Sequence, residues 1–146
     1  MNARKGAILI VEDDPNDLEL TLLVLGRHRF ANEMVVARDG AEALDYLFAT
    51  GAHAARDARD LPAVVLLDIK LPKVDGLEVL RRLRADERTR LVPVVLLTSS
   101  SEERDMLRGY DLGANSYVRK PVEFERFVAA VSELGAYWLL LNERPA

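Results

Sequence analysis

The sequence predicts an α/β fold in which helices cover both faces of a parallel β-sheet. Short apolar runs alternate with amphipathic helical patterns along the chain. A short run that is apolar at every position is typical of a strand buried on both faces, as in a parallel sheet between two helical layers. Alternating strands and helices, joined by right-handed crossovers, leave only a few possible topologies.

Five segments are the predicted strands. Three of them are continuous apolar runs, and the other two carry a weaker strand pattern. The strong runs are Ala7–Val11, Ala63–Leu67 and Leu91–Leu97, and the weaker ones are Met34–Ala37 and Ser116–Val118. Pro93 interrupts the third run near its start, where a proline costs the sheet least.

Five helices are predicted from apolar residues at helical spacing. They cover Pro15–Gly26, Gly40–Phe48, Gly76–Leu83, Glu102–Asp111 and a last segment that starts at Glu123. Pro15 suits the first position of a helix, and Gly113 suits a helix end. The connection Thr50–Pro62 is longer than is usual between a helix and a strand.

Length and composition indicate one soluble domain over residues 1–146, with a core at about 6–134 and a C-terminal extension at about 135–146. The absence of cysteine excludes disulfides and thiol nucleophiles. The net charge of −4 argues against nucleic acid as a partner. No apolar stretch approaches the ~18 residues of a membrane span, and no signal peptide precedes the first apolar run, so the cytoplasm is expected.

Polar side chains follow four of the predicted strands at the point where each strand ends. In chain order they are Glu12, Asp13 and Asp14, then Asp68, then Thr98 and Ser99, and last Lys120. Ligands of an open α/β sheet lie outside the carboxyl ends of its strands. The sequence therefore predicts a pocket of acids, a hydroxyl and a lysine at one edge of the sheet.

Carboxylates gathered in this way repel one another, by about 4 kcal/mol per pair at ~4 Å and an effective dielectric of ~20. Mg²⁺ relieves such repulsion and prefers carboxylates, water and phosphate oxygens as ligands. An aspartate nucleophile beside a metal ion and a lysine suits phosphoryl transfer to a carboxylate.

Each of these residues also has a plain structural interpretation when taken alone. Asp13 or Asp14 would serve as the N-cap before Pro15, and Thr98 or Ser99 would cap a following helix in a capping box with Glu102. Lys120 alone would be an ordinary surface lysine. The coincidence of all of them at strand ends favours the pocket.

Four segments resemble the successive signatures of the response-regulator receiver family: ILIVEDDPND, LLDIKLPKVDG, VVLLTSSS and YVRKP. The resemblance implies a flavodoxin-like (βα)₅ fold, a doubly wound parallel sheet with strand order 2-1-3-4-5, here with an extended C-terminal helix. The long loop from Thr50, the LPKVDG run and the tail AYWLLLNERP resemble single-domain receivers paired with bacterial phytochrome histidine kinases.

The resemblance also implies a role for each residue at a matching position. Asp68 would be the phosphoacceptor, with Lys120 and Thr98 beside it. Mg²⁺ would be held by Glu12, Asp13, Asp68 and the backbone carbonyl of Lys70. The switch would consist of Thr98 and Tyr117. The peptide bond between Lys120 and Pro121 would be cis. The implied partner is a sensor histidine kinase, and we expect no output domain after the last helix, so the downstream partner stays open.

Two other classes of function fit part of this pattern. A haloacid-dehalogenase-like phosphatase also uses an aspartate nucleophile and Mg²⁺, but it needs a second aspartate two residues later, where this chain has Lys70. An interaction adaptor with a vestigial pocket is disfavoured because no pocket position departs from the family pattern.

The C-terminal extension predicts a homodimer. Its run Ala136–Leu141 is apolar nearly all round, and a helix of that kind must be buried on every side. The candidate interface residues are Tyr137, Trp138 and Leu141. The alternatives are that the tail folds back over its own domain or docks on the kinase.

Overall fold

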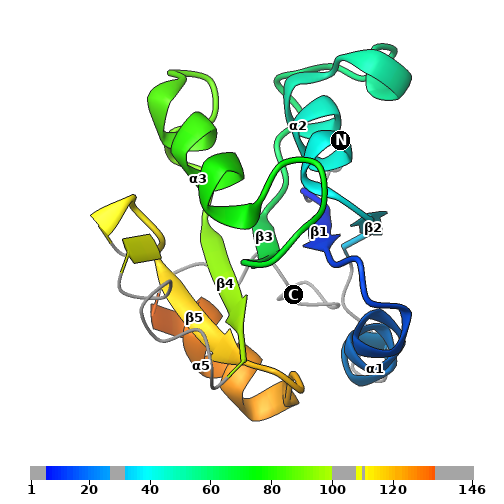
Figure 1. Cartoon of the computed structure of the whole chain (residues 1–146), viewed down its shortest axis with the longest axis vertical. Coiled ribbons are helices and arrows are strands. Elements are labelled where there is room, and N and C mark those ends of the chain that lie inside the picture. Colours follow the sequence, from blue (N-terminus) through cyan, green and yellow to red (C-terminus); the bar gives the residue numbers. More distant parts are fainter. Residues whose placement is uncertain (1–5, 27–31, 100–107, 110, 134–146) are drawn as a thin grey trace, which may run out of the picture.

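Five parallel strands form the central sheet, in the order β2-β1-β3-β4-β5 (Figure 1), which confirms the predicted topology. The structure is a computed structural model that describes residues 6–26, 32–99, 108–109 and 111–133. The strands are β1 (Ile8–Val11), β2 (Met34–Ala37), β3 (Val64–Asp68), β4 (Val94–Thr98) and β5 (Ser116–Arg119).

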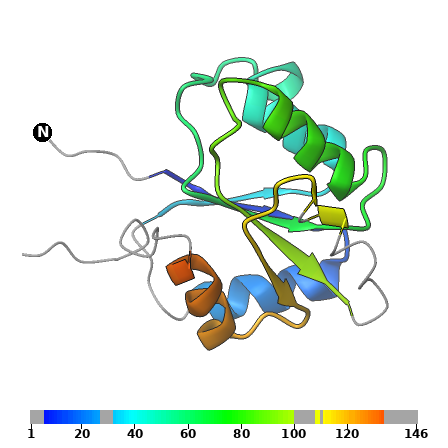
Figure 2. The same cartoon turned by 90° about the vertical axis from the view of Figure 1, so that its left-hand side faces the viewer.

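Helices cover both faces of this sheet. They are α1 (Pro15–Gly26), α2 (Gly40–Phe48), α3 (Gly76–Ala85) and α5 (Phe124–Glu133). Figure 2 shows α2 and α3 on one face and α1 and α5 on the other. Of the predicted helix Glu102–Asp111, residues 108, 109 and 111 are described and are helical. No helix in the described ranges has the length and apolar character needed to span a membrane.

The strand pleat divides the core into two clusters, one on each face of the sheet. Leu9 of β1 and Leu67 of β3 pack with α2 and α3, whereas Ile10 and Leu66, their sequence neighbours, pack with α1 and α5. Successive side chains of a strand point to opposite faces. All four are fully buried, which explains why the strands show continuous apolar runs in the sequence.

The predicted start of β4 was wrong. The strand begins at Val94 rather than at Leu91, because Pro93 has no N–H to give to the sheet. Leu91 lies in the turn before the strand and is 83% exposed. At the other end, β3 includes Asp68 as its last residue, so this aspartate takes part in the sheet register opposite Leu97.

The long connection between α2 and β3 is an ordered loop that contains the short helix η1 (Gly51–His53). Arg56 links this loop to α2, because its guanidinium donates to the backbone carbonyls of Tyr46 and Asp60. The guanidinium carbon also lies 3.7 Å from the centre of the Tyr46 ring. His53 stands edge-on to the same ring, while His28 lies outside the described residues.

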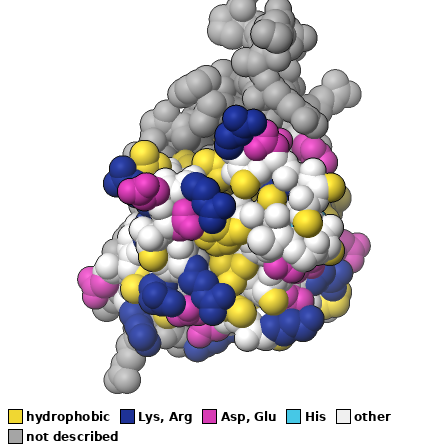
Figure 3. All heavy atoms as spheres, turned by 90° about the horizontal axis from the view of Figure 1, so that it is seen from above, with side chains coloured by type: hydrophobic (Ala, Val, Ile, Leu, Met, Phe, Trp, Pro, Cys, Tyr) yellow, Lys and Arg dark blue, Asp and Glu magenta, His cyan; other side chains and the backbone are white. Residues whose placement is uncertain are grey.

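Acidic and basic side chains are interspersed on the face covered by α2 and α3 (Figure 3). On α3, Glu78 pairs with both Arg81 and Arg82, at 2.6 and 2.8 Å. Both arginines lie on the solvated face of this helix. Exposed ion pairs of this kind contribute little to stability.

Gly76 carries a testable packing constraint, because it begins α3 directly behind Asp68. A Cβ at this position would lie 2.1 Å from the backbone oxygen of Asp68, and backbone atoms cannot yield as a flexible side chain does. We expect Gly76→Ala to lower the free energy of unfolding by roughly 1–3 kcal/mol in urea denaturation. Gly26→Ala is the matched control, since its Cβ would meet no atom of the described residues within 4 Å. Equal stability of the two variants would contradict this packing.

Candidate functional site

The predicted pocket residues gather at the carboxyl edge of the sheet. Glu12 and Asp13 follow β1, Asp68 and Thr98 end β3 and β4, and Lys120 follows β5. Glu12 is fully buried, and Asp68 and Thr98 are each 2% exposed, which is unusual for polar residues. The edge therefore holds buried polar groups that need partners.

Three carboxylates lie close enough to share one cation. Glu12, Asp13 and Asp68 each offer an oxygen, and these oxygens lie within 4.8 Å of one another. Asp68 Oδ1 is buried and has no hydrogen-bond partner within the part of the chain that the structure describes. A buried, unpaired carboxylate oxygen is costly, and oxygen ligands of this kind suit a hard divalent cation. The residues present thus fit the metal that the sequence predicts.

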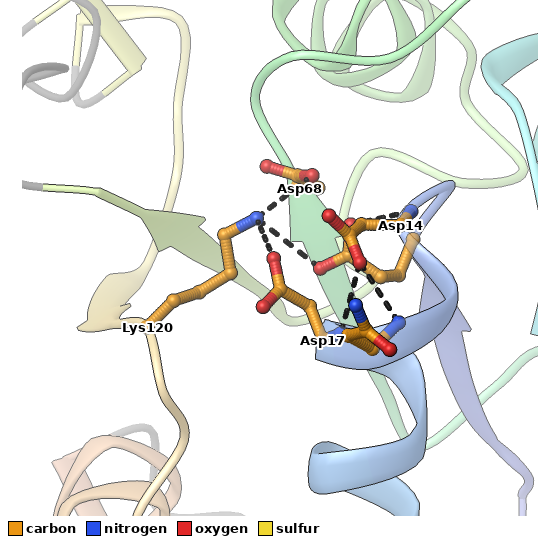
Figure 4. A network of polar contacts seen from close by, with 6 residues as sticks. Asp14, Asp17, Asp68 and Lys120 are labelled. Carbon is orange, nitrogen blue, oxygen red and sulfur yellow. Dashed lines mark hydrogen bonds and ion pairs between the residues drawn. The ribbon is translucent and has the colours of Figure 1, made fainter.

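Lys120 balances part of this charge (Figure 4). Its Nζ donates to Asp68 Oδ2 at 3.1 Å, to Glu12 Oε1 at 3.3 Å and to Asp17 Oδ2 at 3.1 Å. An ammonium has three N–H donors, so these contacts occupy all of them. Sequence reasoning missed Asp17, which reaches Lys120 from the first turn of α1.

Two pKa values in the pocket are raised, that of Glu12 mainly by burial and that of Lys120 by its acidic neighbours. Burial raises the pKa of the Glu12 carboxyl from 4.5 to about 8, the nearby Asp68 carboxylate adds to this rise, and Lys120 opposes it. Burial lowers the pKa of the Lys120 ammonium, but the charges of Asp68 and Glu12 outweigh burial and raise it above its usual range. Without a metal ion, Glu12 therefore holds a proton near neutral pH, and Lys120 stays charged.

Asp14 is the N-cap of α1. Its Oδ1 accepts the backbone N–H groups of Asn16 at 2.8 Å and Asp17 at 3.2 Å. Asp13, the other capping candidate before Pro15, belongs instead to the acidic cluster. The backbone N–H of Asp14 also donates to Glu12 Oε2 at 3.3 Å, so the same turn orients the buried glutamate.

The other predicted residues lie around this centre. The backbone carbonyl of Thr98 accepts the Lys120 N–H at 2.7 Å, and the Lys120–Pro121 peptide bond is cis. Tyr117 lies in β5 with 37% of its surface exposed. It lines a hollow of about 510 Å³ with Arg119 and Arg126.

Lys70 follows β3 with an exposed side chain, and its predicted role as a metal ligand belongs to its backbone carbonyl. The capping box with Glu102 and the dimer candidates Tyr137, Trp138 and Leu141 lie outside the described residues.

Residues 8–132 match the profile of the response regulator receiver domain, and the chain belongs to this family. Among solved structures it is similar to the bacteriophytochrome response regulator AtBRR, with 57% identity over 97% of this chain and 100% of that one, at a TM-score of 0.87. It also resembles the Mn²⁺-bound response regulator Rcp1, with 33% identity over 97% and 99% of the two chains and a TM-score of 0.74. Similarity to these response regulators supports the phytochrome-associated subfamily predicted from the sequence.

In sequence, the chain is also similar to the probable methanogenesis regulatory protein FilR2 of Methanothrix harundinacea. It is 43% identical over 138 residues, which are 94% of this chain and 86% of that protein.

The raised pKa of Glu12 predicts that protons and divalent cations compete for the acidic cluster. Because a bound cation displaces the Glu12 proton, cation affinity should rise with pH below about 8, by up to about tenfold per pH unit. Calorimetric titration with Mg²⁺ at pH 6, 7 and 8 measures this rise. In Glu12→Gln the rise should be largely lost. An affinity that is constant between pH 6 and 8 in the unsubstituted protein would contradict the assignment.

The same pKa sets the pH dependence of stability in metal-free buffer. Between 4.5 and about 8 the folded protein binds a proton at Glu12 that the unfolded chain has lost. The free energy of unfolding should therefore fall as the pH rises through this window, and added Mg²⁺ should restore it. Urea denaturation at pH 5 and 8, with and without Mg²⁺, tests this, and a Glu12→Gln protein should lose this part of the pH dependence.

Proposed function

We propose that this chain accepts a phosphoryl group on Asp68 from a phosphohistidine of a sensor histidine kinase, in a Mg²⁺-dependent reaction. One observation carries the proposal: the buried Asp68 carboxylate has one oxygen on Lys120 and the other without a hydrogen-bond partner among the described residues. A carboxylate held in this way is a positioned nucleophile with a cation beside it. The chain is a phosphoacceptor with self-catalysed transfer rather than an enzyme acting on a separate substrate.

In the transfer, an Asp68 oxygen forms a bond to phosphorus while the bond between phosphorus and the histidine nitrogen breaks. The product is an acyl phosphate on Asp68, and the histidine leaves as the neutral imidazole after taking up a proton. Mg²⁺ held by Glu12, Asp13, Asp68 and the backbone carbonyl of Lys70 would neutralise charge on the phosphoryl oxygens. The Lys120 ammonium adds to this, and its raised pKa keeps it charged throughout.

Thr98 and Tyr117 form the proposed switch. A phosphoryl group brings strong acceptor oxygens next to the end of β4, where the Thr98 hydroxyl would donate to them. Thr98 lies opposite Arg119 in the register of the two strands, and Tyr117 lies two residues earlier on β5. Movement of Thr98 would leave room for Tyr117 to turn inward, which changes the surface around the β5–α5 hollow.

The proposed kinase partner is a bacteriophytochrome, and the proposed compartment is the cytoplasm. The similarity to AtBRR, at 57% identity over nearly the full length of both chains, supports the partner. The Mn²⁺ bound to Rcp1 supports a divalent site in this subfamily, and Mg²⁺ takes the same carboxylate ligands.

The phosphoacceptor assignment has a direct test. Incubation with acetyl phosphate and Mg²⁺ should add one phosphoryl group to the protein by intact-mass analysis, and Asp68→Asn should abolish it because an amide is a poor nucleophile. Asp57→Asn, in the α2–β3 loop, is the control and should react as the unsubstituted protein does. Phosphorylation of Asp68→Asn at the unsubstituted rate would show that the acceptor lies elsewhere.

We also propose a homodimer through the C-terminal extension. The support is the sequence alone, since a largely apolar extension needs a partner surface. Sedimentation at micromolar concentration should show a dimer, and Trp138→Glu with Leu141→Glu should give a monomer that is still phosphorylated on Asp68. A monomer both with and without phosphorylation would refute the proposal.

A further inference from the structure

Asp17 is the partner of Lys120 that stands apart from the metal cluster. Of the three carboxylates that contact the ammonium, Glu12 and Asp68 also belong to the group of oxygens that can share a cation. Asp17 does not belong to this group, and its side chain is 34% exposed, against 0% for Glu12 and 3% for Asp68. Its contact with Lys120 is therefore the most solvent-accessible of the three, and Figure 4 shows it reaching the ammonium from α1.

The position of Asp17 is fixed by its helix. Its backbone N–H donates to the cap residue Asp14, and its neighbour Leu18 is buried in the core. Asp17 lies in the first turn of α1, where the helix dipole favours a negatively charged side chain.

The three contacts of Lys120 leave it no spare N–H donor. To bind an oxygen of an incoming phosphoryl group, the ammonium must release one of its carboxylates. Glu12 and Asp68 are buried and would lose a hydrogen bond that water cannot replace, whereas Asp17, with 34% of its side chain exposed, can be hydrated when it is released. The Asp17 contact is thus the one that gives way.

We propose that Asp17 is a positioning residue that competes with the phosphoryl group for Lys120 and thereby slows phosphorylation of Asp68. The proposal rests on Asp68 being the phosphoacceptor. Asp17 acts in two ways that add: it holds the ammonium toward solvent, and it places one more negative charge beside the path of an anionic donor. Asp17→Asn removes the negative charge and weakens the hold on the ammonium, while it keeps the size and shape of the side chain.

The test compares two small phosphodonors of different charge. For dianionic acetyl phosphate, the second-order rate constant of Asp68 phosphorylation should rise in Asp17→Asn by on the order of fivefold. For phosphoramidate, which carries one net negative charge at neutral pH, the rise should be smaller. A merely structural role of Asp17 would not make the effect depend on donor charge. Asp17→Glu, which retains the carboxylate, should return the rate for acetyl phosphate toward that of the unsubstituted protein.

Glu19→Gln is the matched control, because it removes one charge from the exposed surface of the same helix without touching Lys120. It should leave both rates unchanged. A second readout uses Mn²⁺ alone: its affinity, measured from free Mn²⁺ by electron paramagnetic resonance, should change less in Asp17→Asn than in Asp13→Asn, since Asp17 lies outside the cluster.

Three outcomes would overturn the proposal: no change or a slower reaction with acetyl phosphate in Asp17→Asn, an equal gain in Glu19→Gln, or an equal gain with both donors. Asp17→Ala, with a residue that favours helices, repeats the test should the asparagine variant unfold. If the unsubstituted protein is not phosphorylated by either donor, the proposed function fails. If the unsubstituted protein reacts and Asp17→Asn reacts at the same rate, only the role of Asp17 fails.

Discussion

The rest of the site depends on the repulsion among carboxylates crowded at one edge of the sheet. Among the described residues, Glu12, Asp17 and Asp68 contact the ammonium of Lys120, and Asp13 joins Glu12 and Asp68 in the acidic cluster. Full ionisation would leave a net negative charge around the buried carboxyls of Glu12 and Asp68, which is unfavourable. The metal-free protein relieves the excess by keeping a proton on Glu12, whose pKa is raised to about 8. A divalent cation relieves it more completely, and this makes the pocket receptive to a cation and an anionic phosphoryl group together.

The scaffold can hold this unfavourable group because the strands beneath it are packed on both faces. The residues of β1, β3 and β4 are buried along their whole length, and the clusters above and below the sheet fix them from both faces. Gly76 lets α3 begin directly against the backbone of Asp68, where a Cβ would clash with the Asp68 carbonyl oxygen. The stability that the core contributes thus offsets the unfavourable charges at one edge of the sheet, as is common for functional sites.

Local patterns predicted the parts of this structure that depend on local chemistry. Continuous apolar runs predicted β1 and β3, since burial on both faces leaves no room for polar residues, and the strand-end acids predicted the cluster. The strand order came from family resemblance, because contacts between distant segments leave no periodic signal. For the same reason the sequence did not reveal Arg84. It stands beside Arg81 and Arg82 on α3, yet it is half-buried and donates to the backbone carbonyls of Val92 and Gly113 and to Asn115 Oδ1. No spacing rule separates it from its solvated neighbours.

Asp17 was missed for a related reason. Its contact with Lys120 joins residues 103 positions apart, and in the sequence it is one more acid in the first turn of a helix, where an acid has an ordinary explanation. Only the fold shows that this turn lies beside the end of β5. Helix α1 therefore does more than cover the sheet. Its first turn orients Glu12 through the backbone N–H of Asp14, and it also brings Asp17 to Lys120. The charge of the pocket is set by α1 as well as by the strand ends, and a partner that contacts the exposed side of Asp17 would alter the lysine without entering the metal cluster.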